Sequence, residues 1–204
     1  MHLIFDLDGT LVNSLPGIAD SLNASLTEHD LDGYPVEAIR EFIGNGSRTL
    51  CHRAAPDAEE SVIDSLEASF KKHYSDLWLK GTTIYGGILE LLANIPDHYH
   101  LSVLSNKPHA FTTEIVDKLF PAGTFHTVLG QREGIAKKPD PRGIHEIIKN
   151  SGHKDQNAFL IGDSTVDLAT AQAGDMAPLI FSWGYGTPEG IPLLHQAKDL
   201  ISAL

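Results

Sequence analysis

The chain has 204 residues, of which 42% are hydrophobic, so it can bury one good core with a smaller second one. Its formal net charge of -12 and its pI near 5.2 argue against nucleic acid or an anionic membrane surface as the main partner. No apolar stretch approaches membrane-spanning length, and the single cysteine, Cys51, excludes an intramolecular disulfide and fits a reducing cytoplasm. We therefore expect a cytoplasmic protein with no nucleic-acid and no membrane partner, whose oligomeric state the sequence does not predict.

The chain begins with a short apolar run, residues 2–5, that leads directly into two acids, Asp6 and Asp8. On a strand, side chains two positions apart point the same way, so both carboxylates can face one reacting centre. Gly9 lets the backbone turn away, and Thr10 adds a hydroxyl that can bond an anionic oxygen. Like charges this close favour a compensating divalent cation, and we expect Mg²⁺. The alternative for this segment alone is a solvated turn after a core strand.

A helical block follows this first predicted strand. The apolar periodicity predicts helices at residues 15–26, 36–42, 62–77 and 88–95. Asn13 or Ser14 can cap the first of them, and Pro16 is tolerated in its first turn. Residues 14–80 thus contain helices and no convincing strand, which indicates an insertion after the first strand.

Strand and helix patterns alternate in the rest of the chain. Short apolar runs predict strands at residues 101–104, 127–129, 158–161 and 177–181. Helices are predicted at residues 111–119 and 144–148, the second ending near Gly152, and an alanine-rich segment separates the last two strands. This alternation predicts an α/β fold with a parallel sheet covered by helices on both faces. The stretch 189–204 carries the weakest pattern.

The loops after the predicted strands carry the polar chemistry. In an open parallel sheet, ligands bind beyond the carboxyl ends of the strands. The loops with hydroxyl, amide, lysine or acidic side chains at this edge are residues 6–10, 105–108, 137–141 and 162–167. Each loop alone has a structural interpretation, such as a helix cap or a solvated charge. Their joint occurrence at successive strand ends favours one shared site.

These loops resemble the signatures of the haloacid dehalogenase-like hydrolase superfamily, which correspond to residues 6–11, 105–107, 138–141 and 162–167. Within the superfamily, the chain is similar to the phosphoglycolate phosphatase-like branch. That similarity rests on residues 44–46 with Arg48, on residues 85–87 and on residues 183–186.

The resemblance covers nearly the whole chain and implies its domain organisation. Residues 1–13 and 82–204 would form a Rossmann-like catalytic core, and residues 14–81 would form a helical cap domain inserted after the first strand.

The resemblance implies a magnesium-dependent phosphatase that hydrolyses a small, phosphoglycolate-like phosphate monoester. Asp6 would attack phosphorus and form an aspartyl-phosphate intermediate. Asp8 would protonate the leaving alkoxide and then activate water, while Lys138 would neutralise charge on the transferring group. Mg²⁺ would be held by the Asp6 carboxylate, the Asp8 backbone carbonyl and Asp163.

Further residues would complete the site. Asp167 would orient the metal shell or the catalytic lysine. Ser105 and Asn106 would bond the phosphoryl oxygens, with Thr10 as another hydroxyl near them. In the cap, Gly46 and Arg48 would contact substrate, Arg48 by pairing with a substrate carboxylate. The alternative for Arg48 is an ion pair on the cap surface.

Other functions on the same scaffold stay open. A phosphomutase or a pyrophosphatase would use the same acids, and a nucleotide is another candidate substrate. A dehalogenase has no use for an acid at position 8, because halide leaves without a proton. A phosphonate hydrolase would need a desolvated cap lysine, which no sequence feature marks. A non-catalytic binding protein ranks lower, because every expected active-site residue is present.

Overall fold

The computed structural model describes residues 1–151 and 158–204 and contains a six-stranded sheet in the order β5-β4-β1-β6-β7-β8. The strands are β1 (His2–Phe5), β4 (His100–Pro108), β5 (Thr127–Gln131), β6 (Ala158–Gly162), β7 (Ala177–Phe181) and β8 (Leu193–Leu194). All neighbouring strands run parallel, with Leu3 of the central strand beside Leu101 on one side and Phe159 on the other. The carboxyl ends of β1, β4 and β6 therefore meet at one edge.

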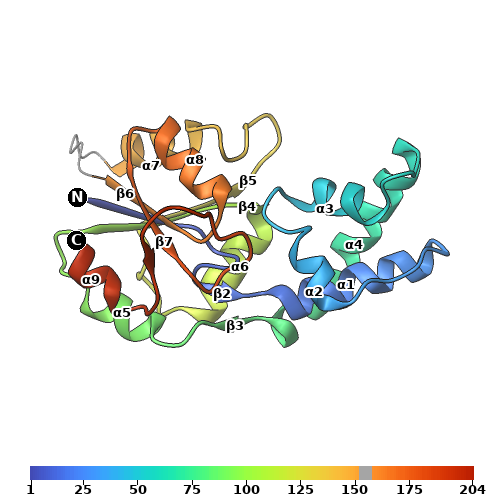
Figure 1. The fold of residues 1–204 in the computed structure, drawn as a ribbon, viewed down its shortest axis with the longest axis horizontal. Helices are drawn as coiled ribbons and strands as arrows, with labels where there is room; N and C mark the ends of the chain where they lie inside the picture. Colours follow the sequence, from blue (N-terminus) through green and yellow to red (C-terminus); the bar gives the residue numbers. More distant parts are fainter. Residues whose placement is uncertain (152–157) are drawn as a thin grey trace.

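Helices cover both faces of this sheet. Figure 1 shows α7 (Arg142–Ser151) and α8 (Thr165–Ala173) above the sheet, and α5 (Ile88–Asn94), α6 (His109–Leu119) and α9 (Asp199–Ala203) below it. Alternation along β1 accounts for the two layers. Leu3 and Phe5 belong to a core cluster on the α5 and α6 side, whereas Ile4 packs in a second cluster with residues of α7.

Four helices lie beyond the carboxyl edge of the sheet, at the right of Figure 1. They are α1 (Leu15–Glu28), α2 (Val36–Arg40), α3 (Ser47–Ala54) and α4 (Glu60–Gly81). The chain enters and leaves this group through an antiparallel pair, β2 (Val12–Asn13) and β3 (Thr83–Ile84). Helices α1 and α4 approach closely at two glycines, because a Cβ added to Gly81 would lie 2.3 Å from the backbone N of Gly17.

The structure confirms the predicted α/β class, with its parallel sheet and helices on both faces. It adds α3, the β2–β3 pair, β8 and α9, none of which the sequence pattern indicated. Strand β4 continues past residue 104 to Pro108, so part of the second polar loop belongs to the strand. The predicted helix end near Gly152 lies outside the described residues. The division into a core and a cap domain stays a prediction.

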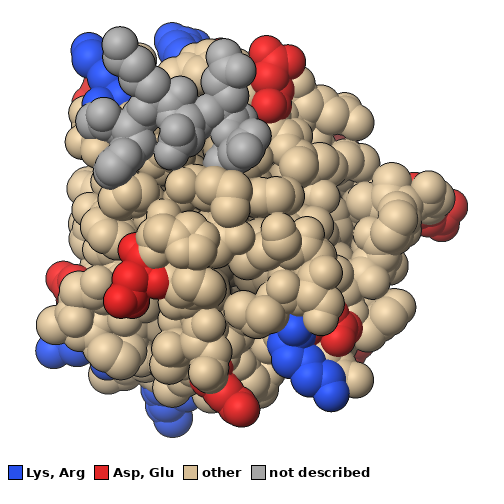
Figure 2. Space-filling view, turned by 90° about the vertical axis from the view of Figure 1, so that its left-hand side faces the viewer, with Lys and Arg blue, Asp and Glu red and all other residues tan. Residues whose placement is uncertain are grey.

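The surface carries charges of both signs. Figure 2 views the end of the molecule opposite α1 to α4, where Lys and Arg side chains and Asp and Glu side chains are scattered around the edge. Across residues 1–151 and 158–204, no helix combines the length and the apolar character needed to cross a membrane.

Candidate active site

The first acid follows directly from the central strand. Asp6 lies immediately after β1, and its N–H donates to the carbonyl of Ile161 in β6 at 2.8 Å, so the backbone is fixed where the carboxylate emerges. Gly9 has a φ of 85°, and a Cβ there would lie 2.5 Å from Oδ2 of Asp163. Only glycine therefore lets this loop approach the loop that follows β6.

Three buried carboxylates meet at this edge. Asp6, Asp163 and Asp167 each offer an oxygen, and these oxygens lie within 4.8 Å of one another. Asp163 is held by two further loops: its Oδ1 accepts from Oγ1 of Thr10 at 2.7 Å and its Oδ2 accepts from the backbone N–H of Tyr185 at 2.7 Å. The three oxygens are close enough to share one small cation.

Lys138 is a cation inside this acid cluster. Its Nζ lies 2.7 Å from Oδ1 of Asp167 and 2.8 Å from Oδ1 of Asp6, and the side chain is 3% exposed. The second oxygen of Asp167 accepts from the backbone N–H groups of Asp163 and Ser164 and caps α8 together with the Ser164 hydroxyl. Asp167 is thus fixed by its own helix and fixes Lys138 in turn.

The cluster carries more negative charge than Lys138 offsets. Burial raises the pKa of Asp6 from 3.8 to about 7, with Lys138 opposing the rise and Asp167 adding to it. Burial also raises the pKa of Asp163 to about 8, and the charges of Asp167 and Asp6 add to that rise. A hard cation that prefers oxygen ligands would stabilise the ionised form of both carboxyls and so lower both pKa values. The donor set therefore fits Mg²⁺.

The second acid has partners of its own. Oδ1 of Asp8 accepts from Oγ of Ser14 at 2.5 Å, and Nζ of Lys107 lies 3.1 and 3.0 Å from the two Asp8 oxygens. Burial alone would lower the pKa of the Lys107 ammonium, but the Asp8 carboxylate raises it above its usual value. The ring of Tyr74 in α4 covers the ammonium, with Nζ 4.5 Å from the ring centroid.

The polar end of β4 links the sheet to the helices. Asn106 donates through Nδ2 to the carbonyls of Gly44 at 3.0 Å and Lys138 at 3.1 Å, and its Oδ1 accepts from the N–H of Lys138 at 2.8 Å. The Asn106 amide therefore positions the Lys138 loop. Ser105 is 5% exposed, and its Oγ accepts from the N–H of Lys107 at 3.3 Å.

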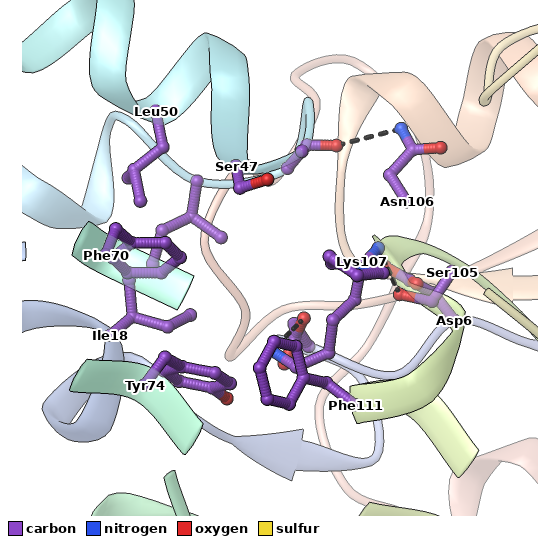
Figure 3. Close-up of a pocket in the computed structure, with 15 residues that line it drawn as sticks. Asp6, Ile18, Ser47, Leu50, Phe70, Tyr74, Ser105, Asn106, Lys107 and Phe111 are labelled. Atoms are coloured by element: carbon purple, nitrogen blue, oxygen red, sulfur yellow. Dashed lines mark hydrogen bonds and ion pairs between the residues drawn. The ribbon is translucent and has the colours of Figure 1, made fainter. Parts of the chain in front are cut away.

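A cavity opens between the acids and the helices. It has about 550 Å³ of space not filled by atoms, open solvent included. Figure 3 shows apolar side chains from the helices, including Ile18, Leu50 and Phe70, on one side of it, and Asp6 and Ser105 on the other. A small molecule in this space would touch the acids with one end and an apolar wall with the other.

The structure separates the predicted substrate-binding residues into two groups. Ser105, Asn106 and Gly46 line the cavity. Thr10 is fully buried and donates to Asp163, which makes it a support for the acid cluster. Arg48 is not among the cavity-lining residues in the described part of the chain, and its guanidinium pairs instead with Asp64 and Glu60 of α4. Substrate binding by Thr10 and Arg48 stays a prediction.

Sequence reasoning assigned no role in the site to three residues that the structure brings there. Lys107 contacts Asp8, Tyr185 holds Asp163, and Ser14 reaches Asp8 from the start of α1. Lys107 follows two predicted site residues directly, and Tyr185 lies between two glycines, so local sequence signals existed for both. Ser14 was a candidate cap for α1, but its side chain makes no cap hydrogen bond.

Comparisons with known proteins agree on one family. The family model described as haloacid dehalogenase-like hydrolase matches residues 3–179. The phosphoglycolate phosphatase of Rhodospirillum rubrum is 34% identical to this chain, and the match covers 90% of this chain and 80% of that protein. The phosphoglycolate phosphatase of Psychrobacter arcticus is 33% identical, and the match covers 99% of this chain and 93% of that protein. A crystal structure of a predicted phosphoglycolate phosphatase from Haemophilus somnus 129pt matches with a TM-score of 0.89 and 26% identity, covering 98% of this chain and 96% of that one.

Proposed function

The chain belongs to the haloacid dehalogenase-like hydrolase family, and we propose that it is a magnesium-dependent phosphatase acting on a small, phosphoglycolate-like monoester. One observation carries the proposal: the Asp6, Asp163 and Asp167 oxygens lie within 4.8 Å of one another, and Asp6 also lines the cavity between the acids and the helices. The curated relatives named phosphoglycolate phosphatase support the choice of ester.

Asp6 acts as the nucleophile. Its carboxylate attacks phosphorus, the bond to the ester oxygen breaks, and an aspartyl-phosphate forms. Asp8 gives a proton to the leaving oxygen and later takes one from the water that hydrolyses the intermediate. Support for these roles comes from position: Asp6 and Asp8 both line the cavity, and Ser14 and Lys107 hold the Asp8 carboxylate from two sides.

The Asp6 carboxylate, the Asp8 backbone carbonyl and Asp163 would hold Mg²⁺, which supplies positive charge for the phosphoryl oxygens. Asp167 orients Lys138 through the 2.7 Å contact and lies close enough to support the same ion. Lys138 in turn faces Asp6 and offsets charge as the phosphoryl group arrives. The acidic chain thereby gains a locally positive site for an anion.

Ser105 and Asn106 complete the phosphoryl site. Ser105 offers a hydroxyl at the cavity wall, and Asn106, whose amide already holds the Lys138 loop, acts mainly by keeping that lysine in place. Gly46 lets the cap backbone come near this point, because a Cβ there would lie 3.3 Å from the carbonyl oxygen of Asn106. Charge and positioning supply most of the rate in phosphoryl transfer.

Residues 14–81 act as a cap over a core formed by residues 1–13 and 82–204. Contacts between the two parts support closure in this structure. Arg40 of α2 donates to the carbonyl of Gly184, and Lys137 donates to the carbonyl of Asn45 at 2.5 Å. The antiparallel β2–β3 pair is the place where a hinge would lie. Closure excludes water from the phosphoryl group.

The proposal is tested by turnover of p-nitrophenyl phosphate and of 2-phosphoglycolate by the purified protein, with and without Mg²⁺. Steady turnover that requires Mg²⁺ and falls to background in Asp6→Asn is expected. An Arg132→Gln variant serves as a folded control, because that side chain lies outside the cavity and pairs with Glu146. Turnover that survives in Asp6→Asn would refute the assignment. A cytoplasmic location stays a prediction from composition.

A further inference from the structure

The cavity wall contains one cation among its described lining residues, Lys107. Asp6 and Asp8 supply negative charge at the same wall, and Lys138 does not line the space. Opposite them, the helices contribute Ile18, Leu50 and Phe70, which Figure 3 shows gathered away from the polar side chains. Among the described lining residues, Lys107 is therefore the one cationic side chain that a second anionic group on the substrate could meet.

The Lys107 ammonium is buried and contacts both Asp8 and Tyr74. Its side chain is 6% exposed, and its Nζ lies 3.0 Å from Oδ2 of Asp8. The Tyr74 ring covers another side of the ammonium at 4.5 Å. An ammonium has three N–H donors, so it can serve a second carboxylate while keeping Asp8. Burial makes each such contact stronger than it would be in water.

The position of Asp8 fixes where the alcohol part of a substrate lies. The ester oxygen must reach the Asp8 carboxyl, which donates its proton. In an ester of glycolate, the carboxylate oxygens lie roughly 3 Å from that ester oxygen by standard bond lengths. Nζ of Lys107 lies 3.0 Å from the same Asp8 carboxyl, so it falls within reach of such a carboxylate.

We propose that Lys107 receives the carboxylate of the substrate's alcohol part, so that the site selects phosphate monoesters of short 2-hydroxy acids. The inference rests on the proposed phosphatase function and adds the residue that sets its specificity. The apolar wall limits the length of the acid, since a polyhydroxylated chain reaching Ile18 and Phe70 would bury hydroxyl groups without partners.

The test compares two esters that differ only in this charge, 2-phosphoglycolate and its neutral amide, phosphoglycolamide. The native enzyme is expected to show a kcat/KM at least about tenfold higher for the acid, because the amide cannot form the ion pair between a carboxylate and the Lys107 ammonium. Lys107→Met keeps an unbranched, flexible side chain only one atom shorter and removes its charge. Turnover of both esters falls in this variant because Asp8 loses a partner, and the preference for the acid disappears.

Lys137→Met is the matched control. This neighbouring lysine contacts the carbonyl of Asn45 and does not line the cavity, so the variant keeps the native preference. A preference that survives in Lys107→Met would overturn the inference and leave Lys107 as a positioning residue for Asp8. Should that variant not fold, competitive inhibition of the native enzyme by glycolate and by glycolamide decides, and equal inhibition overturns the inference. A native enzyme inactive on both esters and on p-nitrophenyl phosphate refutes the proposed function itself.

Discussion

Removal of divalent cations should make the stability of this protein depend on pH in a direction set by the acid cluster. The pKa of Asp6 is raised to about 7 and that of Asp163 to about 8, whereas both stand near 3.8 in an unfolded chain. Between pH 5 and pH 7 the folded state therefore binds protons that the unfolded state has released. The free energy of unfolding falls as pH rises through this window, because ionising either buried carboxyl costs stability.

The size of the effect follows from the number of protons. Each proton bound only by the folded state changes the free energy of unfolding by about 1.4 kcal/mol per pH unit. If the folded state holds one such proton on the Asp6–Asp163 pair, the free energy of unfolding falls by about 3 kcal/mol between pH 5 and pH 7. Saturating Mg²⁺ keeps the carboxylates ionised and paired, so the slope should flatten. At a concentration 100 times its Kd, the ion itself adds about 2.7 kcal/mol.

Urea denaturation at pH 5, 6 and 7, in EDTA and in MgCl₂, measures the pH dependence of the free energy of unfolding and the stabilisation that Mg²⁺ adds. The Asp163→Asn variant is the control, because it removes one of the two carboxyls whose pKa is raised and leaves every other titratable group in place. Its slope in EDTA should be smaller than that of the native chain. Equal slopes in the two proteins, or a native stability that rises from pH 5 to pH 7 in EDTA, would refute the reasoning.

Three further predictions concern packing and positioning. Gly81→Ala should lower the free energy of unfolding by about 1–3 kcal/mol, because its Cβ would lie 2.3 Å from the backbone N of Gly17. Gly86→Ala serves as the control in the same urea titration, because a Cβ there would meet open space. Tyr185→Phe should lower the free energy of unfolding by about 1–2 kcal/mol in thermal unfolding, because the hydroxyl accepts from the backbone N–H groups of Ser14 and Leu15, at 2.8 and 3.1 Å. Asp167→Asn should lower kcat about 10–100-fold with a smaller change in KM, because it releases Lys138, the proposed charge-stabilising lysine, without touching substrate. An unchanged kcat would contradict that positioning role.

Much of the fold was predictable because the buried strands carry unbroken apolar runs that stop at polar loops. The run 158–161, for example, corresponds closely to β6, and Asp163 follows it by two residues. The two-residue strands β2 and β3 were not predictable, because so short a pair has no periodicity and forms only through its partner. Helix α3 was missed because its eight residues are mostly polar, and only three of them are buried.

The site was predictable to the extent that strand ends converge. Asp6 and Asp163 follow neighbouring parallel strands, so their proximity follows from topology alone. The partners of each side chain depend on loops whose paths the sequence does not specify. Thr10 turned toward Asp163, and Asn106 toward the backbone of the Lys138 loop. Arg48 lies among acids of α4, an arrangement that requires knowing how α3 packs on α4.

The proposed chemistry is tested most directly by trapping the phosphoryl group. In Asp8→Asn with p-nitrophenyl phosphate, whose leaving group needs no proton, attack by Asp6 should proceed while hydrolysis of the intermediate slows. We expect a burst of one p-nitrophenolate per enzyme, and mass spectrometry after acid quench should find one phosphoryl group on the peptide that contains Asp6. A phosphoryl group on another residue, or an equal burst when Asp6 is also replaced by Asn, would contradict nucleophilic attack by Asp6.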